Sequence, residues 1–194
     1  MTYKRIFLVF SLLALLLLVS ACGPSNTVRL LPMKPAASVL PTPSASTIAV
    51  VKFTDKRVDT SSLGLRRDKS YFTTMDDTAD WVSKAIADRL SASGFQVSYT
   101  MNASSAKRAA PDYILNGSID QLEVRETSAT SFEAKIRVNY VLANKDKVIL
   151  RQPLMAAGST TTFPNNSAVE KLLAETLKDI VEPMNEKIST IVQH

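Results

Sequence analysis

Residues 132–142 constrain the fold of this chain more than any other segment, because one face of the segment is entirely apolar and the other carries the polar residues Glu133, Lys135, Arg137 and Asn139. The apolar set is Phe132, Ala134, Ile136, Val138, Tyr140 and Leu142. Side chains of a β-strand point alternately to its two faces, so one face of this strand must be buried and the other wet. That pattern is typical of an antiparallel sheet covered on one side. The polar residues 144–147 then predict a hairpin turn into a strand at residues 148–156.

Three more strands are predicted from shorter patterns. Residues 48–53 form a β-branched run typical of a mostly buried strand, and residues 95–99 alternate. Residues 112–124 alternate as far as Ile119 and then slip to Leu122, which indicates a β-bulge. The polar segments 54–76 and 100–111 are expected to be loops.

Two amphipathic helices are predicted. The first begins at Asp77, whose side chain can cap it, and ends at Gly94. The second begins with a capping box from Ser167 to Glu170 and keeps an apolar face over about six turns, with a kink expected at Pro183. The element order β-α-β-β-β-β-α predicts an α+β fold: a mostly antiparallel sheet of four to five strands with both helices on one face, a two-layer sandwich.

The N-terminus has the pattern of a secretory signal peptide, residues 1–21. Two basic residues precede an apolar run, residues 6–19, in which only Ser11 is polar. The run is short for a membrane-spanning helix, which needs about 17–25 residues. Small residues and then Cys22, the only cysteine in the chain, follow it, so no disulfide can form within the chain.

The tetrapeptide Val19-Ser20-Ala21-Cys22 resembles the lipobox of bacterial lipoproteins. The resemblance implies a diacylglycerol on the Cys22 thiol and cleavage just before it. Gly23 in place of aspartate implies, for a Gram-negative host, the outer membrane facing the periplasm rather than the inner membrane. The other interpretation is a small apolar cysteine at the end of a plain signal peptide or membrane anchor.

Composition divides the rest of the chain into a tether and a domain. Residues 22–46 hold the lipidated cysteine and five of the nine prolines, and about 24 such residues reach roughly 27 Å as a flexible coil. Within them, residues 28–31 are apolar enough to dock on the domain as a short strand. Residues 47–194 are expected to form a single domain. Without the signal peptide the net charge is +3, from 21 basic and 18 acidic residues, so attraction to anionic surfaces is mild.

Patterns for catalysis are absent from the sequence. The sole histidine is His194 at the chain end, and the five glycines are too scattered for a phosphate-binding loop. A serine–lysine pair at Ser104 and Lys107 lacks its companion motifs. Acidic residues 76, 77 and 80 are expected at a helix N-terminus. We therefore expect no catalytic residue, no metal and no cofactor beyond the covalent lipid on Cys22.

The segment 54–70 is the candidate contact surface. Five cations oppose three acids there, and two leucines flank Gly64. The candidate residues for contact with a partner are Lys56, Arg57, Leu63, Arg66 and Arg67. The alternative is a solvated loop whose leucines pack against the core. No aromatic residues interleave with these charges, so nucleic acid is not an expected partner.

The chain resembles the YajG-like family of bacterial lipoproteins. The resemblance rests on the lipobox, the element order, Asp55-Lys56-Arg57, Leu63-Gly64 and the strand at residues 112–117. That last stretch is also similar to lipoproteins of lipopolysaccharide export and of the curli secretion pore. The resemblance implies a location and an α+β fold, but no catalytic residues.

The leading hypothesis is a non-enzymatic binding or assembly component of the cell envelope, with an envelope protein or an anionic envelope component as partner. The alternative is an accessory subunit of an outer-membrane transport or secretion machine. An enzyme acting on wall or lipid is a third hypothesis, which would require a deep polar cleft.

Overall fold

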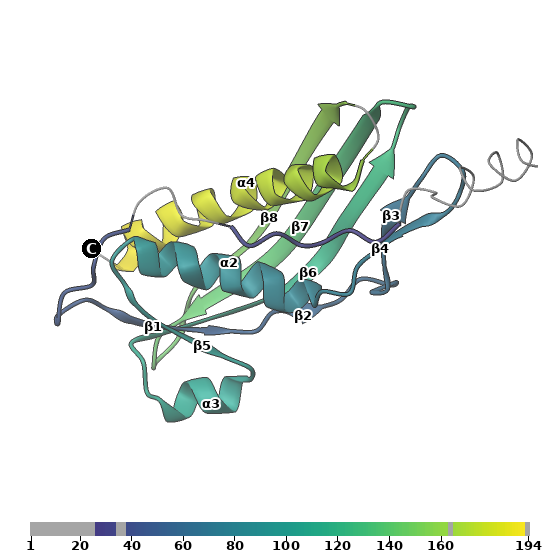
Figure 1. Ribbon diagram of the computed structural model, residues 1–194. Helices are drawn as coiled ribbons and strands as arrows, with labels where there is room; N and C mark the ends of the chain where they lie inside the picture. Colours follow the sequence, from purple (N-terminus) through teal and green to yellow (C-terminus); the bar gives the residue numbers. More distant parts are fainter. Residues whose placement is uncertain (1–25, 34–37, 163–164, 193–194) are drawn as a thin grey trace, which may run out of the picture.

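The computed structural model describes residues 26–33, 38–162 and 165–192 (Figure 1). Residues 1–21, Cys22 and His194 lie outside this part. The elements in chain order are β1 (Thr47–Val51), β2 (Thr54–Asp55), β3 (Ser62–Leu65), β4 (Tyr71–Thr73), α2 (Thr78–Ala92), β5 (Gln96–Thr100), α3 (Ala103–Arg108), β6 (Tyr113–Glu126), β7 (Ser131–Ala143), β8 (Val148–Thr161) and α4 (Asn166–Val192).

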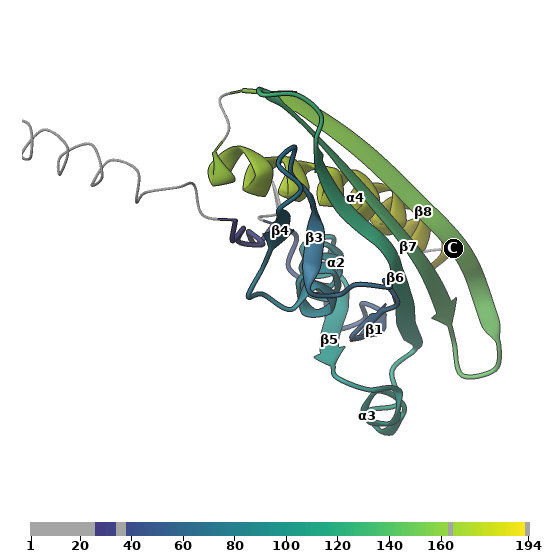
Figure 2. The same cartoon turned by 90° about the vertical axis from the view of Figure 1, so that its right-hand side faces the viewer.

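Strand β6 is the spine of the sheet. One of its edges pairs antiparallel with β7 over almost its whole length, and β7 pairs antiparallel with β8. Figure 2 shows these three strands curving together, with α4 on the inner side of the curve. The register of β6 shifts between Ile119 and Gln121, which confirms the bulge predicted from the slip in the alternation. The alternating burial of β7 confirms the predicted strand at residues 132–142.

The other edge of β6 is parallel, so the predicted mostly antiparallel sheet of four to five strands is wrong for this half. β1, β2 and β3 pair one after another with β6, and β5 pairs with β1, all of them parallel. The described residues form a mixed sheet of eight strands, including a β3–β4 hairpin inside the segment expected to be a loop. The physical reason is that α2 carries the chain back from the end of β1 to the start of β5, as a parallel pair requires.

Helices α2 and α4 cover one face of the sheet, as the sequence predicted (Figure 1). Their buried residues join the inward residues of β6 and β7 in one hydrophobic core. The third helix, α3, was expected to be loop. Its Ala106 packs with Ala49 and Val51 of β1 on the opposite face, next to Ile114.

The helix ends show which capping predictions hold. The Asp77 side chain caps α2 by accepting a hydrogen bond from the Asp80 N–H at 2.9 Å, as predicted. The capping box at Ser167 is wrong, because α4 begins one residue earlier and the Asn165 side chain accepts from the Ala168 N–H at 2.8 Å. Pro183 lies inside α4, which continues past it to Val192.

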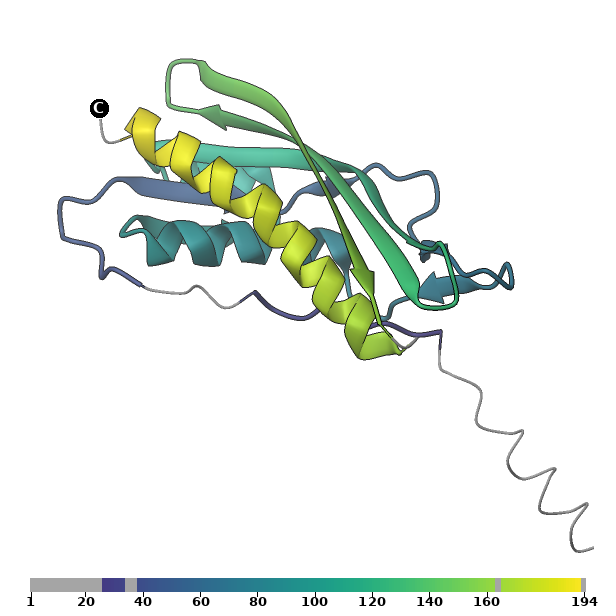
Figure 3. The same cartoon turned by 90° about the horizontal axis from the view of Figure 1, so that it is seen from above.

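Residues 26–33, called the strap below, lie in extended form against α2 and α4 (Figure 3). The Val28 N–H donates to the Thr73 carbonyl at 2.8 Å and the Thr73 N–H donates to the Asn26 carbonyl at 2.9 Å, which adds the strap to β4. Val28 is fully buried, and the Trp81 indole N–H donates to the Leu31 carbonyl at 2.8 Å. The docking predicted for residues 28–31 is therefore confirmed, and it extends over residues 26–33 of the segment that composition assigned to the tether.

Candidate functional site

Arg57, one of the candidate contact residues, is bound inside the protein. Its guanidinium donates to the Asp55 carboxylate at 2.7–3.1 Å, to the Ser62 carbonyl at 2.8 Å and to the Leu122 carbonyl at 3.3 Å. The Thr78 hydroxyl also donates to Asp55, at 2.7 Å. Only 5% of the Arg57 side chain and 14% of the Asp55 side chain are exposed. This cluster therefore fastens β2, the start of β3, β6 and the start of α2 to one another.

The Asp55 carboxylate is held in its charged form. Burial raises the pKa of Asp55, but the hydrogen bonds from Arg57 and Thr78 outweigh it and leave the pKa below its ordinary value. The charge is therefore used to hold the fold rather than offered to a partner.

Leu63, another candidate, is a core residue with 0% of its surface exposed. The neighbouring Gly64 explains how the strand reaches so deep. A Cβ at Gly64 would lie 1.8 Å from the Val124 carbonyl oxygen, and the backbone there has φ of 135°, a conformation that side chains rarely allow. The alternative interpretation of the leucines, packing against the core, is correct for Leu63.

Arg66 is also engaged within the domain. Its guanidinium lies 3.5 Å from the Glu126 carboxylate and 5.2 Å from the centre of the Phe72 ring. It also donates to the Asn26 side-chain oxygen at 2.6 Å. Arg66 therefore joins the β3–β4 hairpin both to β6 and to the first residue of the strap.

The candidates that remain on the surface are Lys56 and Arg67. Arg67 lies in the turn of the β3–β4 hairpin together with Lys69, which was not among the candidates. Two apolar side chains flank this turn on the exposed side: Leu65 is 38% and Tyr71 54% exposed. We call residues 65–71 the hairpin tip; cationic and apolar groups share its surface.

The acidic residues at the start of α2 have structural partners. Asp76 accepts the Leu30 N–H of the strap at 2.7 Å, and Asp80 accepts the Tyr99 hydroxyl at 2.7 Å. Asp77 caps the helix. Within the described residues no group of three or more histidine, cysteine, aspartate or glutamate side chains is placed to hold a metal ion.

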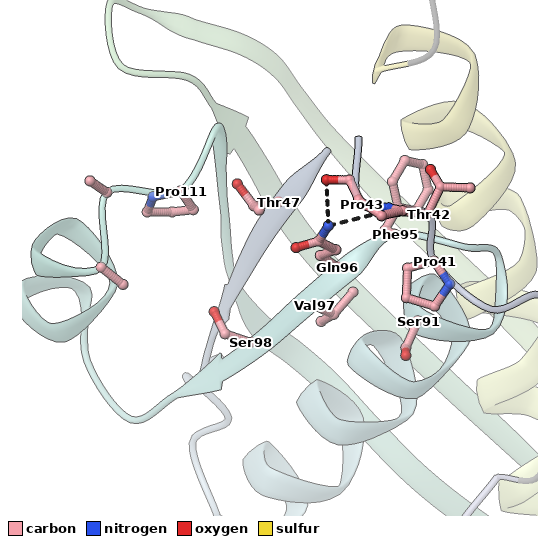
Figure 4. A pocket seen from close by; sticks show the side chains of 12 residues that line it. Pro41, Thr42, Pro43, Thr47, Ser91, Phe95, Gln96, Val97, Ser98 and Pro111 are labelled. Atoms are coloured by element: carbon pink, nitrogen blue, oxygen red, sulfur yellow. Dashed lines mark hydrogen bonds between the residues drawn. The ribbon is translucent and has the colours of Figure 1, made fainter. Parts of the chain in front are cut away.

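A cavity of about 720 Å³ lies beside β5, where residues 41–43 pass the strand (Figure 4). The Gln96 side chain holds this segment by donating to the carbonyls of Thr42 and Pro43 at 3.1 and 3.3 Å. The residues around the cavity are neutral, among them Ser91, Phe95, Val97, Ser98 and Pro111. The cavity could hold a small ligand through shape complementarity and hydrogen bonds, but among the described residues no charged group for acid–base chemistry lines it.

Strand β8 is the open edge of the sheet: of the described strands it pairs only with β7, along 14 residues. The Thr162 N–H donates to the Thr130 carbonyl at 2.7 Å, and bonding alternates along an antiparallel strand. The backbone N–H groups of the odd-numbered residues of β8, such as Ala157, therefore point away from β7, to the open edge of the sheet. Pro153 also takes an odd position, where its missing N–H costs no hydrogen bond to β7.

No helix among the described residues is long and apolar enough to span a membrane. No protein-family model matches the chain, and no curated protein matches it.

Solved structures do resemble this one. Protein XCC0632 from Xanthomonas campestris, of the family DUF330, has a TM-score of 0.57 at 16% identity and covers 78% of this chain and 90% of its own. An uncharacterized protein has a TM-score of 0.57 at 13% identity, over 86% of this chain and 100% of its own. A minor lipoprotein from Acinetobacter baumannii has a TM-score of 0.46 at 14% identity, over 75% of this chain and 93% of its own.

The first two similarities show a shared fold, since the identities are too low to show more. The structural neighbours thus include a DUF330 protein and bacterial lipoproteins. The YajG-like family named from the sequence motifs stays a prediction.

Proposed function

We propose that this protein is a lipoprotein of the bacterial cell envelope, anchored through a diacylglycerol on Cys22 and facing the periplasm, with the outer membrane as its location. The observation that carries the proposal is the sequence Val19-Ser20-Ala21-Cys22 at the end of a signal-peptide pattern. Asn26, four residues after Cys22, is already bonded to Thr73 and Arg66, so a lipid on Cys22 would hold the domain close to the membrane.

Within the envelope we propose a binding or assembly role without catalysis. The charged clusters of the described residues support it, because Asp55, Asp76, Asp80 and Arg57 all hold elements of the fold together. No buried side-chain nitrogen or oxygen in the described part lacks a hydrogen-bond partner. Catalytic groups, by contrast, are commonly strained or held in unusual protonation states to meet a substrate.

Metabolic labelling with radioactive palmitate tests the anchor. We expect label in the wild-type chain, recovered with membranes, and none in Cys22→Ser. The matched control is Cys22→Ser with Ser25→Cys, which keeps one cysteine but moves it out of the lipobox and should also stay unlabelled. Label in this control, or label in Cys22→Ser, would contradict a lipid at Cys22.

The open edge of β8 favours a second candidate, an accessory subunit of an outer-membrane transport or secretion machine. An unpaired strand of this length is a template for a strand of another protein. The test is crosslinking in intact cells followed by isolation through a C-terminal tag. A specific envelope complex that is recovered with the wild type and lost with Ala157→Pro, which removes one outward N–H, would support this role. Recovery of the same complex with both proteins would exclude β8 as the contact.

A further inference from the structure

We propose that the hairpin tip, residues 65–71, rests on the anionic headgroups of the membrane leaflet that holds the Cys22 lipid. The domain then stands on the membrane by one defined end. This inference rests on the proposed lipid anchor and adds to it the contact surface and the orientation.

Only a short stretch of chain separates Cys22 from the docked strap. Four peptide steps separate Cys22 from Asn26, and each spans at most about 3.6 Å, so their Cα atoms are no more than about 14 Å apart. Residues 26–33 are docked: Asn26 bonds to Thr73 and Arg66, and Val28 is fully buried. The reach of about 27 Å expected from a tether of 24 flexible residues is therefore too long.

Asn26 lies next to the base of the β3–β4 hairpin. The Arg66 guanidinium contacts it from the base of the hairpin turn, and Arg66 also pairs with Glu126 at the end of β6. The Asn166 side chain, at the start of α4, donates to the Thr27 carbonyl at 2.8 Å. Figures 1 and 3 show the strap starting at this end, next to β4 and the first turn of α4. A membrane at the anchor therefore faces the hairpin tip.

The hairpin tip carries both cationic and apolar side chains. Glu126 balances Arg66, so Arg67 and Lys69 against Asp68 leave the turn with one net positive charge. Cations near an anionic leaflet are attracted to it, and the amphipathic ring of tyrosine favours the membrane interface. Tyr71, more than half exposed, and Leu65 are placed beside those cations. The tip thus matches a headgroup layer in both charge and polarity.

The opposite end of the domain is out of reach. β7 has 13 residues and α4 has 27, so each runs about 40 Å away from the anchored end. The β7–β8 turn at residues 144–147 and strand β5 lie toward that far end (Figure 1), and β5 borders the cavity. They face the periplasm and stay open to partners.

The test uses the full lipidated chain in vesicles of phosphatidylethanolamine and phosphatidylglycerol, part of which carry a nitroxide on the headgroup. Because Cys22 is the only native cysteine, Asp68→Cys and Asp146→Cys each offer one thiol for a fluorophore, at opposite hairpin turns and with the same loss of charge. We expect nitroxide quenching at position 68 and little at position 146. Equal quenching at both positions would overturn the orientation.

Charge removal tests the headgroup contact itself. Arg67→Ser with Lys69→Gly, added to Asp68→Cys, should lower the ratio of contacting to non-contacting orientations about 25-fold, since each cation near an anionic surface contributes about fivefold. The matched control, Lys145→Ser with Lys147→Ser in Asp146→Cys, should change nothing. Unchanged quenching in the first variant would overturn the contact with anionic headgroups.

Labelling of the wild-type chain with the fluorophore shows whether the lipid anchor itself is absent or only the proposed orientation is wrong. If its Cys22 thiol reacts with the fluorophore, no lipid is attached, and the proposed function and the orientation fall together. If Cys22 is blocked and the two turns are quenched alike, only the orientation is overturned.

Discussion

Replacing Arg57 with methionine should be among the most damaging single substitutions in this domain. The methionine would keep an apolar stem but leave the Asp55 carboxylate without its cation, and it would remove the hydrogen bonds that Arg57 donates to the carbonyls of Ser62 and Leu122. Breaking a buried ion pair by removing one partner costs about 3–5 kcal/mol. Since 5% of the Arg57 side chain and 14% of the Asp55 side chain are exposed, water compensates little, and we expect a loss within that range.

The assay is urea unfolding of the chain without its signal peptide, carrying Cys22→Ser, followed by the fluorescence of Trp81, the only tryptophan. Arg67→Met is the control for an exposed arginine and should change the free energy of unfolding by no more than about 0.5 kcal/mol. Arg57→Met combined with Asp55→Asn should recover part of the loss, because the uncompensated charge is gone. Equal stability of Arg57→Met and Arg67→Met would refute the internal role of Arg57.

The same variant should change the pH dependence of stability. The pKa of Asp55 is lowered in the folded protein, so its contribution is fully present above the unfolded value of about 3.9 and is lost as pH falls through the folded pKa. Without Arg57, burial prevails and raises the pKa, so protonation of Asp55 would stabilise the fold instead. Unfolding measured between pH 3 and pH 6 should therefore show opposite contributions from Asp55 in the two proteins.

Three further predictions concern the strap and the hairpin. Val28→Asp should release the strap and shift the emission of Trp81 to longer wavelength, whereas Val39→Asp, at a position 61% exposed, should not; equal spectra would contradict a docked strap. Gly64→Ala should cost about 3–5 kcal/mol in urea unfolding, from the clash with a β6 carbonyl and the strained φ, and a loss below about 1 kcal/mol would contradict the close approach. Lys69→Gly should raise the free energy of unfolding by about 0.5–1 kcal/mol, because Lys69 has φ of 68°; a loss would contradict strain there.

The antiparallel half of the fold was predictable from the sequence because its signal is local. Alternation along residues 132–142 requires a two-faced strand, and the slip between Ile119 and Leu122 marks the bulge. The Asp77 cap and the apolar stripe of α4 are likewise read from neighbours three or four residues apart.

The parallel half could not be predicted in the same way, since strand partners far apart in sequence leave no periodic pattern. One signal was present: β1 is buried on both faces, as in a parallel sheet, and a helix and a strand follow it. α3 is short and polar, so its composition is that of a loop. The strands of the β3–β4 hairpin have only four and three residues and are joined by a charged turn, which is too short a pattern to predict a strand.

The candidate site was predicted only in part. Charged segments usually face water. The amino-acid sequence of residues 54–70 does not show that Arg57 and Arg66 are bound internally while Arg67 is exposed. That separation depends on distant partners such as Glu126 and Asn26. Proline content predicts a tether for the segment as a whole, but the apolar residues 28–31 within it predicted docking on the domain, and the burial of Val28 and Leu30 confirms this.

The central claim is that the domain is anchored through Cys22 and that its hairpin tip contacts the membrane. Neutron reflectometry of the lipidated protein on a supported bilayer tests this claim most directly. We predict that protein density begins at the headgroup layer, because Asn26 lies within about 14 Å of the anchor residue. A water-filled layer of about 27 Å between headgroups and protein, the reach of a flexible 24-residue tether, would contradict the account.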